Sequence, residues 1–124
     1  MQKKVLIPLP TYGFDPTEAA VPFVQMQKAG ISLFFATPNA TVAKADEIML
    51  NGKGLFIWKN ILKARKDAVI AYNEMIHTEN FLHPISYAEI NPEEYDGLLL
   101  PGGHHKGVKE YLESSILQEK VNYF

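Results

Sequence analysis

Two short segments of the chain contain the residues whose types and spacing could support chemistry. The first is Asp15-Pro16-Thr17-Glu18, and the second is Pro101-Gly102-Gly103-His104-His105. A carboxyl group such as that of Glu18 can act as a general acid or base. Two consecutive glycines let backbone N–H groups turn toward a small anion or a developing oxyanion. The sequence therefore contains one candidate acid and one candidate oxyanion-binding loop.

Each of these residues also has a structural explanation, which the sequence alone leaves open. Glu18 stands three positions after Asp15, where the N3 member of a capping box stands. Gly102 and Gly103 are equally what a tight turn between a strand and a helix requires. His104 and His105 could bind a substrate or a metal ion, although exposed or core histidines are more common. We therefore expect no metal site.

The sequence contains no complete catalytic set. Its lack of cysteine excludes disulfides, thiolate metal ligands and a cysteine nucleophile supplied by these residues. Neither Ser86 nor the Ser114-Ser115 pair lies in a Gly-x-Ser-x-Gly elbow. Gly102 and Gly107 have the spacing of a phosphate loop, but Val108-Lys109 stands where Lys-Ser or Lys-Thr is needed. No Gly-x-Gly-x-x-Gly follows the first apolar run, so we expect no nicotinamide or other cofactor.

Composition and charge narrow the class of protein. The 124 residues are 47% hydrophobic, which is enough for one globular domain spanning residues 1–124. Formal net charge is -2, and no basic run is interleaved with aromatic residues, so nucleic acid is not an expected partner. Only about five apolar residues follow Lys4 before prolines interrupt them, too few for a signal peptide or a membrane span. We expect a cytoplasmic protein without a membrane partner.

The elements that must position the candidate residues alternate between strand and helix. Lys4–Leu9 is a short apolar run, which is typical of a buried parallel strand. Asp15-Pro16-Thr17-Glu18 predicts the start of a helix that runs to about Ala29. Gly30 would end this helix, and Ile31–Ala36 predicts a second strand. A strand, a helix and a strand joined by short connections predict a right-handed parallel unit.

The rest of the chain continues the alternation. Residues 41–54 are polar and contain glycine, which predicts a surface loop. Apolar residues recur every three or four positions between Asn60 and Asn80, which predicts one long amphipathic helix. Gly97–Leu100 predicts a third buried strand. The remaining predictions are a short strand or extended connection at 84–90, a turn or single helical turn at 91–94, and helices at 106–113 and from Ser115 onward.

These elements predict an α/β fold with an open, doubly wound parallel sheet of the flavodoxin-like class. Ligands in such sheets bind beyond the carboxyl ends of the strands. The segment containing Glu18 follows the first predicted strand, and Gly102-Gly103 follows the third. We therefore expect Glu18 and the two glycines to face each other at one edge of the sheet.

Several strings resemble the ThiJ/PfpI superfamily, whose sheet is related to that of class I glutamine amidotransferases. Lys4–Pro10 and Gly13–Ala20 resemble its first strand and helix, and Phe35–Pro38 resembles the end of its second strand. Tyr95–His104, which reads Tyr-Asp-Gly-Leu-Leu-Leu-Pro-Gly-Gly-His, resembles the hallmark of the heat-inducible chaperone and glyoxalase III-like branch. The helix around Ala71-Tyr72 resembles the insert of that branch, so the resemblance covers nearly all of the chain.

The resemblance implies roles for the candidate residues. Glu18 matches the acid that hydrogen-bonds the catalytic cysteine sulfur, and Gly102, Gly103 and His104 match the loop on the oxyanion and substrate side. Family members continue with a strand that ends in that cysteine, usually followed by histidine. We therefore expect this chain to be the N-terminal portion of a ThiJ/PfpI-like domain, truncated before the nucleophile-elbow strand and inactive by itself.

The resemblance also implies an activity for a full-length parent. That parent is expected to be a cofactor-independent glyoxalase or deglycase, or an amidase-like hydrolase. In the glyoxalase case a thiolate adds to a 2-oxoaldehyde such as methylglyoxal, and the glutamate moves the proton to give a hydroxy acid. The alternative is a non-enzymatic holding chaperone or interaction module. Because the sheet would be shortened, we expect a homo-oligomer or a complementing C-terminal fragment as partner.

Overall fold

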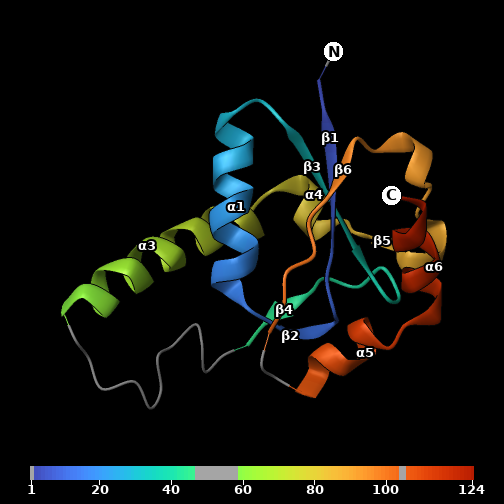
Figure 1. The fold of residues 1–124 in the computed structure, drawn as a ribbon. Helices are drawn as coiled ribbons and strands as arrows, with labels where there is room; N and C mark the ends of the chain where they lie inside the picture. The colour runs from blue at the N-terminus through green and yellow to red at the C-terminus, as the bar shows by residue number, and fades with distance from the viewer. Residues whose placement is uncertain (1, 47–58, 104–105) are drawn as a thin grey trace.

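The computed structural model of the chain describes residues 2–46, 59–103 and 106–124. A parallel sheet with the strand order β5-β3-β1-β6 lies at its centre (Figure 1). β1 pairs with β3 in a register that runs from Lys4 opposite Ser32 to Pro8 opposite Ala36. This sheet, flanked by helices, confirms the predicted flavodoxin-like class. The strand bounds are Lys4–Pro8 for β1, Ser32–Thr37 for β3, Ile85–Ser86 for β5 and Gly97–Leu98 for β6.

The first helix, α1 (Pro16–Lys28), begins as predicted. The Asp15 side chain accepts hydrogen bonds from the backbone N–H groups of Thr17 and Glu18, at 2.8 and 3.3 Å. Pro16 occupies the first helical position, where its missing N–H has no intrahelical role. The helix thereby fixes Glu18 in its first turn, at the start of the first helix that follows β1.

A small second sheet was not predicted. β2 (Tyr12–Phe14) follows β1 and pairs in parallel with β4 (Lys44–Ala45). The predicted loop at 41–54 is therefore wrong at residues 44–45, and residues 47–54 of that prediction lie outside the described ranges. A strand of two residues is too short to show the alternation on which sequence patterns depend.

The predicted single helix between Asn60 and Asn80 is wrong at its C-terminal end. α3 (Lys59–Ile76) stops before Thr78, and α4 (Glu79–Leu82) follows as a separate helix. The Thr78 hydroxyl donates to the Met75 carbonyl at 2.7 Å, and the Thr78 backbone is extended. This break turns Phe81 against Phe35, with ring centroids 5.1 Å apart.

Helices cover both faces of the sheet. In Figure 1, α1 and α3 lie on one side, whereas α5 (Lys109–Leu112) and α6 (Ser115–Tyr123) lie on the other. The core on the α1 side includes Ile7, Phe14 and Phe35, and the core on the α6 side includes Leu6, Tyr111 and Leu117. No helix in the described ranges has both the length and the apolar character to cross a bilayer.

Short 3₁₀ turns and helices complete the face that contains α6. They are η1 (Tyr87–Glu89), η2 (Pro92–Glu94) and η3 (Lys106–Val108), which leads directly into α5. The helical turn predicted at 91–94 and the helix predicted at 106–113 are confirmed. The short strand or extended connection predicted at 84–90 is confirmed only at β5, because residues 87–89 form the 3₁₀ helix η1. The last helix is capped by Ser114, whose hydroxyl accepts from the Leu117 N–H at 3.1 Å, rather than by Ser115 as predicted.

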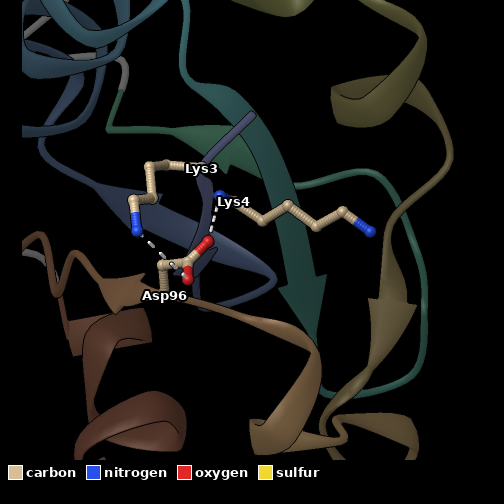
Figure 2. Close-up of polar contacts among 3 residues, drawn as sticks. All are labelled: Lys3, Lys4 and Asp96. Atoms are coloured by element: carbon tan, nitrogen blue, oxygen red, sulfur yellow. Dashed lines mark hydrogen bonds and ion pairs between the residues drawn. The ribbon is translucent and has the colours of Figure 1, made fainter. Parts of the chain in front are cut away.

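The strand β6 lies at the edge of the sheet and differs from the prediction. It covers only Gly97–Leu98, both half-buried, so the predicted buried strand to Leu100 is wrong over its second half. Leu100 is 47% exposed because β6 has β1 on one side and no described strand on the other. Asp96 anchors the start of β6, accepting from the Lys4 backbone N–H at 2.9 Å, with the Lys3 ammonium 4.0 Å from its carboxylate (Figure 2).

Candidate active site at the carboxyl edge of the sheet

Glu18 and Gly102 lie against each other at the carboxyl edge of the sheet. A Cβ atom on Gly102 would stand 3.4 Å from Oε2 of Glu18 and 3.6 Å from its Oε1. Glu18 comes from the first turn of α1, and Gly102 comes from the segment after β6. The Glu18 side chain is exposed, so its carboxylate remains open to a ligand. The fold thus brings together two residues that are far apart in the sequence.

The backbone N–H of Asp15 is bonded to Gly102 and not to the Glu18 carboxylate. In a capping box, the N3 carboxylate would accept from the backbone N–H of the N-cap residue. Here the Asp15 N–H donates to the Gly102 carbonyl at 2.9 Å instead. Asp15 therefore caps α1 through its own side chain and also joins the helix to the glycine loop. The structural alternative for Glu18, a reciprocal capping box, is not formed.

Gly103 is packed more tightly than Gly102. A Cβ atom at Gly103 would stand 2.7 Å from the Gly13 carbonyl oxygen and 2.9 Å from Cγ2 of Val108. Real Cβ atoms essentially never approach other atoms so closely. Gly13 has a φ of 98°, in the left-handed region that favours glycine. Gly103 therefore permits close packing of its own segment against those that contain Gly13 and Val108. Gly102, in contrast, borders the Glu18 side chain.

Two buried tyrosines, Tyr87 and Tyr111, and a second glutamate, Glu110, lie near the carboxyl edge of the sheet. Glu110 of α5 accepts from the Thr11 backbone N–H at 3.2 Å, which ties the helix to the segment after β1. The buried Tyr87 hydroxyl donates to the Leu9 carbonyl. Tyr111 is also buried, and it lies close enough to the Glu18 carboxylate and to Tyr87 for Glu18 to raise the pKa of Tyr111 and for Tyr111 to raise the pKa of Tyr87. Sequence reasoning missed Tyr111 because its only signal was an apolar spacing of three residues from Val108 on a short helix.

Burial and neighbouring charge keep two of these phenols protonated. Burial, followed by the negative charge of Glu18, raises the pKa of Tyr111 well above the ordinary value of 10.0. Burial, with smaller contributions from Tyr111 and Glu110, raises the pKa of Tyr87 in the same direction. Both phenols are therefore hydrogen-bond donors throughout the physiological pH range.

We expect this protonation to be visible when the protein is titrated with alkali. Tyr87 and Tyr111 should ionise only at a pH above that at which exposed tyrosines do, about pH 10. Because the folded pKa lies above the unfolded one, their contribution to stability is complete below about pH 10 and declines as the pH rises further. Tyrosinate absorbance should therefore rise in two stages, the second coinciding with loss of the circular dichroism signal.

The matched control replaces both Tyr87 and Tyr111 with phenylalanine, which should reduce the second stage of ionisation. A single rise near pH 10 in the folded wild-type chain would contradict the assignment.

The other predicted site residue, His104, lies outside the described residues, as does His105. Within the described ranges, no group of three or more His, Cys, Asp or Glu side chains is arranged to hold a metal ion. The described site consequently comprises one open carboxylate, a glycine loop and buried phenols. This arrangement can exchange protons and donate hydrogen bonds, and it needs a nucleophile from elsewhere for covalent chemistry.

A parallel α/β sheet with an acid and a glycine loop at its carboxyl edge defines a class of flavodoxin-like proteins with a ligand site at that edge. The family model described as "ThiJ/PfpI family-like" matches residues 9–124. The chain therefore belongs to the ThiJ/PfpI-like family, as its strings of residues predicted; its branch within the superfamily remains a prediction.

One relative and several solved structures are similar to the chain. The uncharacterized protein C14C4.04 of Schizosaccharomyces pombe is 34% identical over 114 residues, which are 90% of this chain and 41% of that protein. The DJ-1 superfamily protein Atu0886 from Agrobacterium tumefaciens is 18% identical with a TM-score of 0.55, covering 99% of this chain and 48% of that one. The Rapid Encystment Protein 24 KDa of Francisella tularensis is 16% identical with a TM-score of 0.64, covering 98% and 53%.

These similarities differ in what they support. The solved structures support a shared fold and no shared function, because they are only 16% and 18% identical to this chain. The chain spans about two fifths of the fission-yeast relative and about half of each matched structure.

Proposed function

We propose that residues 1–124 form the acid and oxyanion side of a ThiJ/PfpI-type active site whose cysteine comes from polypeptide outside these residues. The observation that carries the proposal is the Glu18 carboxylate beside Gly102 at the carboxyl edge of the sheet. The exposed carboxylate and the glycine loop are two of the three parts that such a site needs, and the third is a thiol.

The chemistry that these parts support best is the conversion of a 2-oxoaldehyde to a 2-hydroxy acid without a cofactor. A thiolate adds to the aldehyde carbon of methylglyoxal, and the oxyanion that forms is protonated as a hemithioacetal. Glu18 removes the proton from the former aldehyde carbon while the neighbouring ketone oxygen takes up a proton, which gives an enediol. Glu18 then returns its proton to the neighbouring carbon while the hydroxyl on the former aldehyde carbon loses its proton, which leaves the thioester of a 2-hydroxy acid. Water then hydrolyses the thioester to lactate and frees the thiol. A deglycase or amidase-like hydrolase would use the same thiol, acid and oxyanion loop.

The open edge of β6 is where we expect the cysteine-bearing strand to add. Gly102-Gly103 follows β6, so a strand beside β6 would bring its own carboxyl end to Glu18. An unpaired edge strand is a ready template for such an addition. A cytoplasmic location, where thiols remain reduced, would suit this chemistry.

Reconstitution tests the proposal. Residues 1–124 can be joined to the part of the fission-yeast relative that lies C-terminal to its matched region. We expect this reconstituted protein to convert methylglyoxal to lactate, whereas the 124-residue chain alone gives no lactate above a heat-treated control, because it has no cysteine. Lactate is measured by an enzyme-coupled assay.

Two controls accompany the assay. A reconstituted protein in which each cysteine of the added part is replaced by serine should be inactive. A cooperative thermal melt shows that the reconstituted protein has folded. Absence of lactate from a folded, reduced reconstituted protein would contradict the glyoxalase proposal, and lactate formation by the chain alone would contradict the need for a thiol.

The second candidate function is a holding chaperone or interaction module, favoured by large apolar side chains that the structure exposes. They include Leu100, Leu112, Ile116 and Tyr123, all between the end of β6 and the C-terminal residues. A holding chaperone should suppress the heat-induced aggregation of an unrelated client protein without turning over methylglyoxal. Replacing Leu112 with serine should weaken that suppression if this surface binds clients.

We expect the isolated chain to form homo-oligomers, or to aggregate, rather than remain a monodisperse monomer of 14.0 kDa. The reason is the open edge of β6 together with the 47% exposed side chain of Leu100. Light scattering behind a sizing column measures the mass. Leu100→Lys, which places a charge beside the edge, should shift the distribution toward the monomer.

The control for this shift is Leu82→Lys, which changes a similarly exposed leucine on α4. A monodisperse wild-type monomer with a cooperative melt would contradict the expectation.

A further inference from the structure

The carboxylate of Asp15 is buried and takes no part in the proposed chemistry. Asp15 is only 6% exposed, and charged side chains are rarely buried to this extent without partners. Its oxygen Oδ1 accepts from the backbone N–H groups of Thr17 and Glu18, at 2.8 and 3.3 Å. The backbone of Glu18 is therefore anchored through the Asp15 side chain.

The peptide group that joins Phe14 to Asp15 is held on both of its sides. The Phe14 carbonyl accepts from the Asp46 N–H at 2.9 Å, directly after β4. The Asp15 N–H donates to the Gly102 carbonyl, also at 2.9 Å. Gly103 packs against the same peptide group, since a Cβ atom there would stand 3.3 Å from the Asp15 nitrogen. The backbone of Asp15 therefore has a fixed place between β4 and the glycine loop.

These contacts make Asp15 a shared support for both parts of the candidate site. Its backbone is bonded to the glycine loop, and its side chain is bonded to the turn of α1 that contains Glu18. Proton transfer requires the acid to stay in place relative to the reacting carbon, and a displacement of about 1 Å can cost about 10²-fold in rate. Asp15 links Glu18 to the glycine loop through one residue and thereby limits such a displacement.

We propose that Asp15 is a positioning residue of this site, which holds Glu18 in register with the glycine loop through hydrogen bonds from Oδ1 to the first turn of α1. Asp15 acts through Glu18 and touches neither the thiol nor the substrate. This inference rests on the proposed function and extends it by one residue. The role depends on an acceptor oxygen at this place, so asparagine can fill it and alanine cannot.

Kinetics of the reconstituted protein with methylglyoxal test the role of Asp15. We expect Asp15→Ala to lower kcat by about 10-fold or more and to leave KM within about 2-fold, because it disturbs proton transfer and not substrate binding. Asp15→Asn keeps the acceptor oxygen and should retain kcat within about 3-fold of the parent. The matched control is Ser114→Ala, which removes the side chain that caps α6. It should cost a similar amount of stability and leave kcat unchanged.

Asp15→Gly serves as a second variant if Asp15→Ala does not fold. Glycine removes the same oxygen at a smaller cost to helix stability, so its kcat should fall as that of Asp15→Ala does. Parent kcat in a folded protein without the Asp15 side chain would overturn the inference. So would an Asp15→Asn protein as slow as Asp15→Ala, or a Ser114→Ala protein slowed to the same extent.

Hydrogen exchange of the 124-residue chain, followed by mass spectrometry, tests the positioning without any activity. Asp15→Ala should accelerate exchange about 5-fold in peptides that contain the Thr17 and Glu18 amides, as the loss of a typical N-cap predicts, and Asp15→Asn should not. Unchanged exchange in Asp15→Ala would overturn the inference. Absence of lactate from the parent reconstituted protein would contradict the proposed function alone, because the exchange measurement needs no thiol.

Discussion

Replacing Gly103 with alanine is expected to lower the free energy of unfolding by about 2–3 kcal/mol, as overpacking of a tight site does. The new Cβ atom would stand 2.7 Å from the Gly13 carbonyl oxygen and 2.9 Å from Cγ2 of Val108. The carbonyl belongs to the backbone, and Val108 is buried, so neither neighbour can move without shifting its segment. For a domain of this size, the loss corresponds to a fall of about 10 °C in the midpoint of thermal unfolding.

The matched control for this variant is Gly102→Ala. Its Cβ atom would stand 3.4 Å from Glu18 Oε2, which is an ordinary contact with the end of a flexible side chain. The expected loss of stability is below about 1 kcal/mol. Thermal melts of both variants at one protein concentration, followed by circular dichroism, make the comparison. Equal melting temperatures for the two variants would show that the glycine loop is less tightly packed than the structure has it.

The sequence predicted the parts of the fold that local chemistry determines. Asp15, Pro16 and Glu18 predicted the start of α1 correctly, because capping depends on residues that are neighbours in the chain. The sheet edge at which Glu18 meets Gly102 also followed, because parallel strands bring their carboxyl ends together. The family resemblance named the same two residues.

Other features depend on contacts that no local pattern reveals. β6 carries an apolar sequence typical of a central strand, yet Leu100 is exposed because no described strand pairs with the outer edge of β6. The helix break at Thr78 was missed because no glycine or proline stands between Ile76 and Glu79 to mark it. Glu18 was open to interpretation as a capping residue, since only the structure shows that the Asp15 N–H donates to Gly102. Tyr111 entered the site through tertiary packing alone.

We propose that Glu18 is the acid partner of a cysteine at this sheet edge, and Glu18→Gln in the reconstituted protein tests this role most directly. Glutamine keeps the size of the side chain and its place beside Gly102 but cannot accept and return a proton. General acid–base catalysis typically contributes about 10²- to 10⁴-fold to a rate. We therefore expect kcat for conversion of methylglyoxal to lactate to fall by at least about 100-fold.

The control is Glu119→Gln, which removes an exposed carboxylate from α6 and should leave kcat unchanged. Thermal melts should show that both variants retain the stability of the parent protein. We expect a fall in kcat of about 100-fold or more that is confined to Glu18→Gln. A Glu18→Gln protein that turns over methylglyoxal as fast as the parent would contradict it.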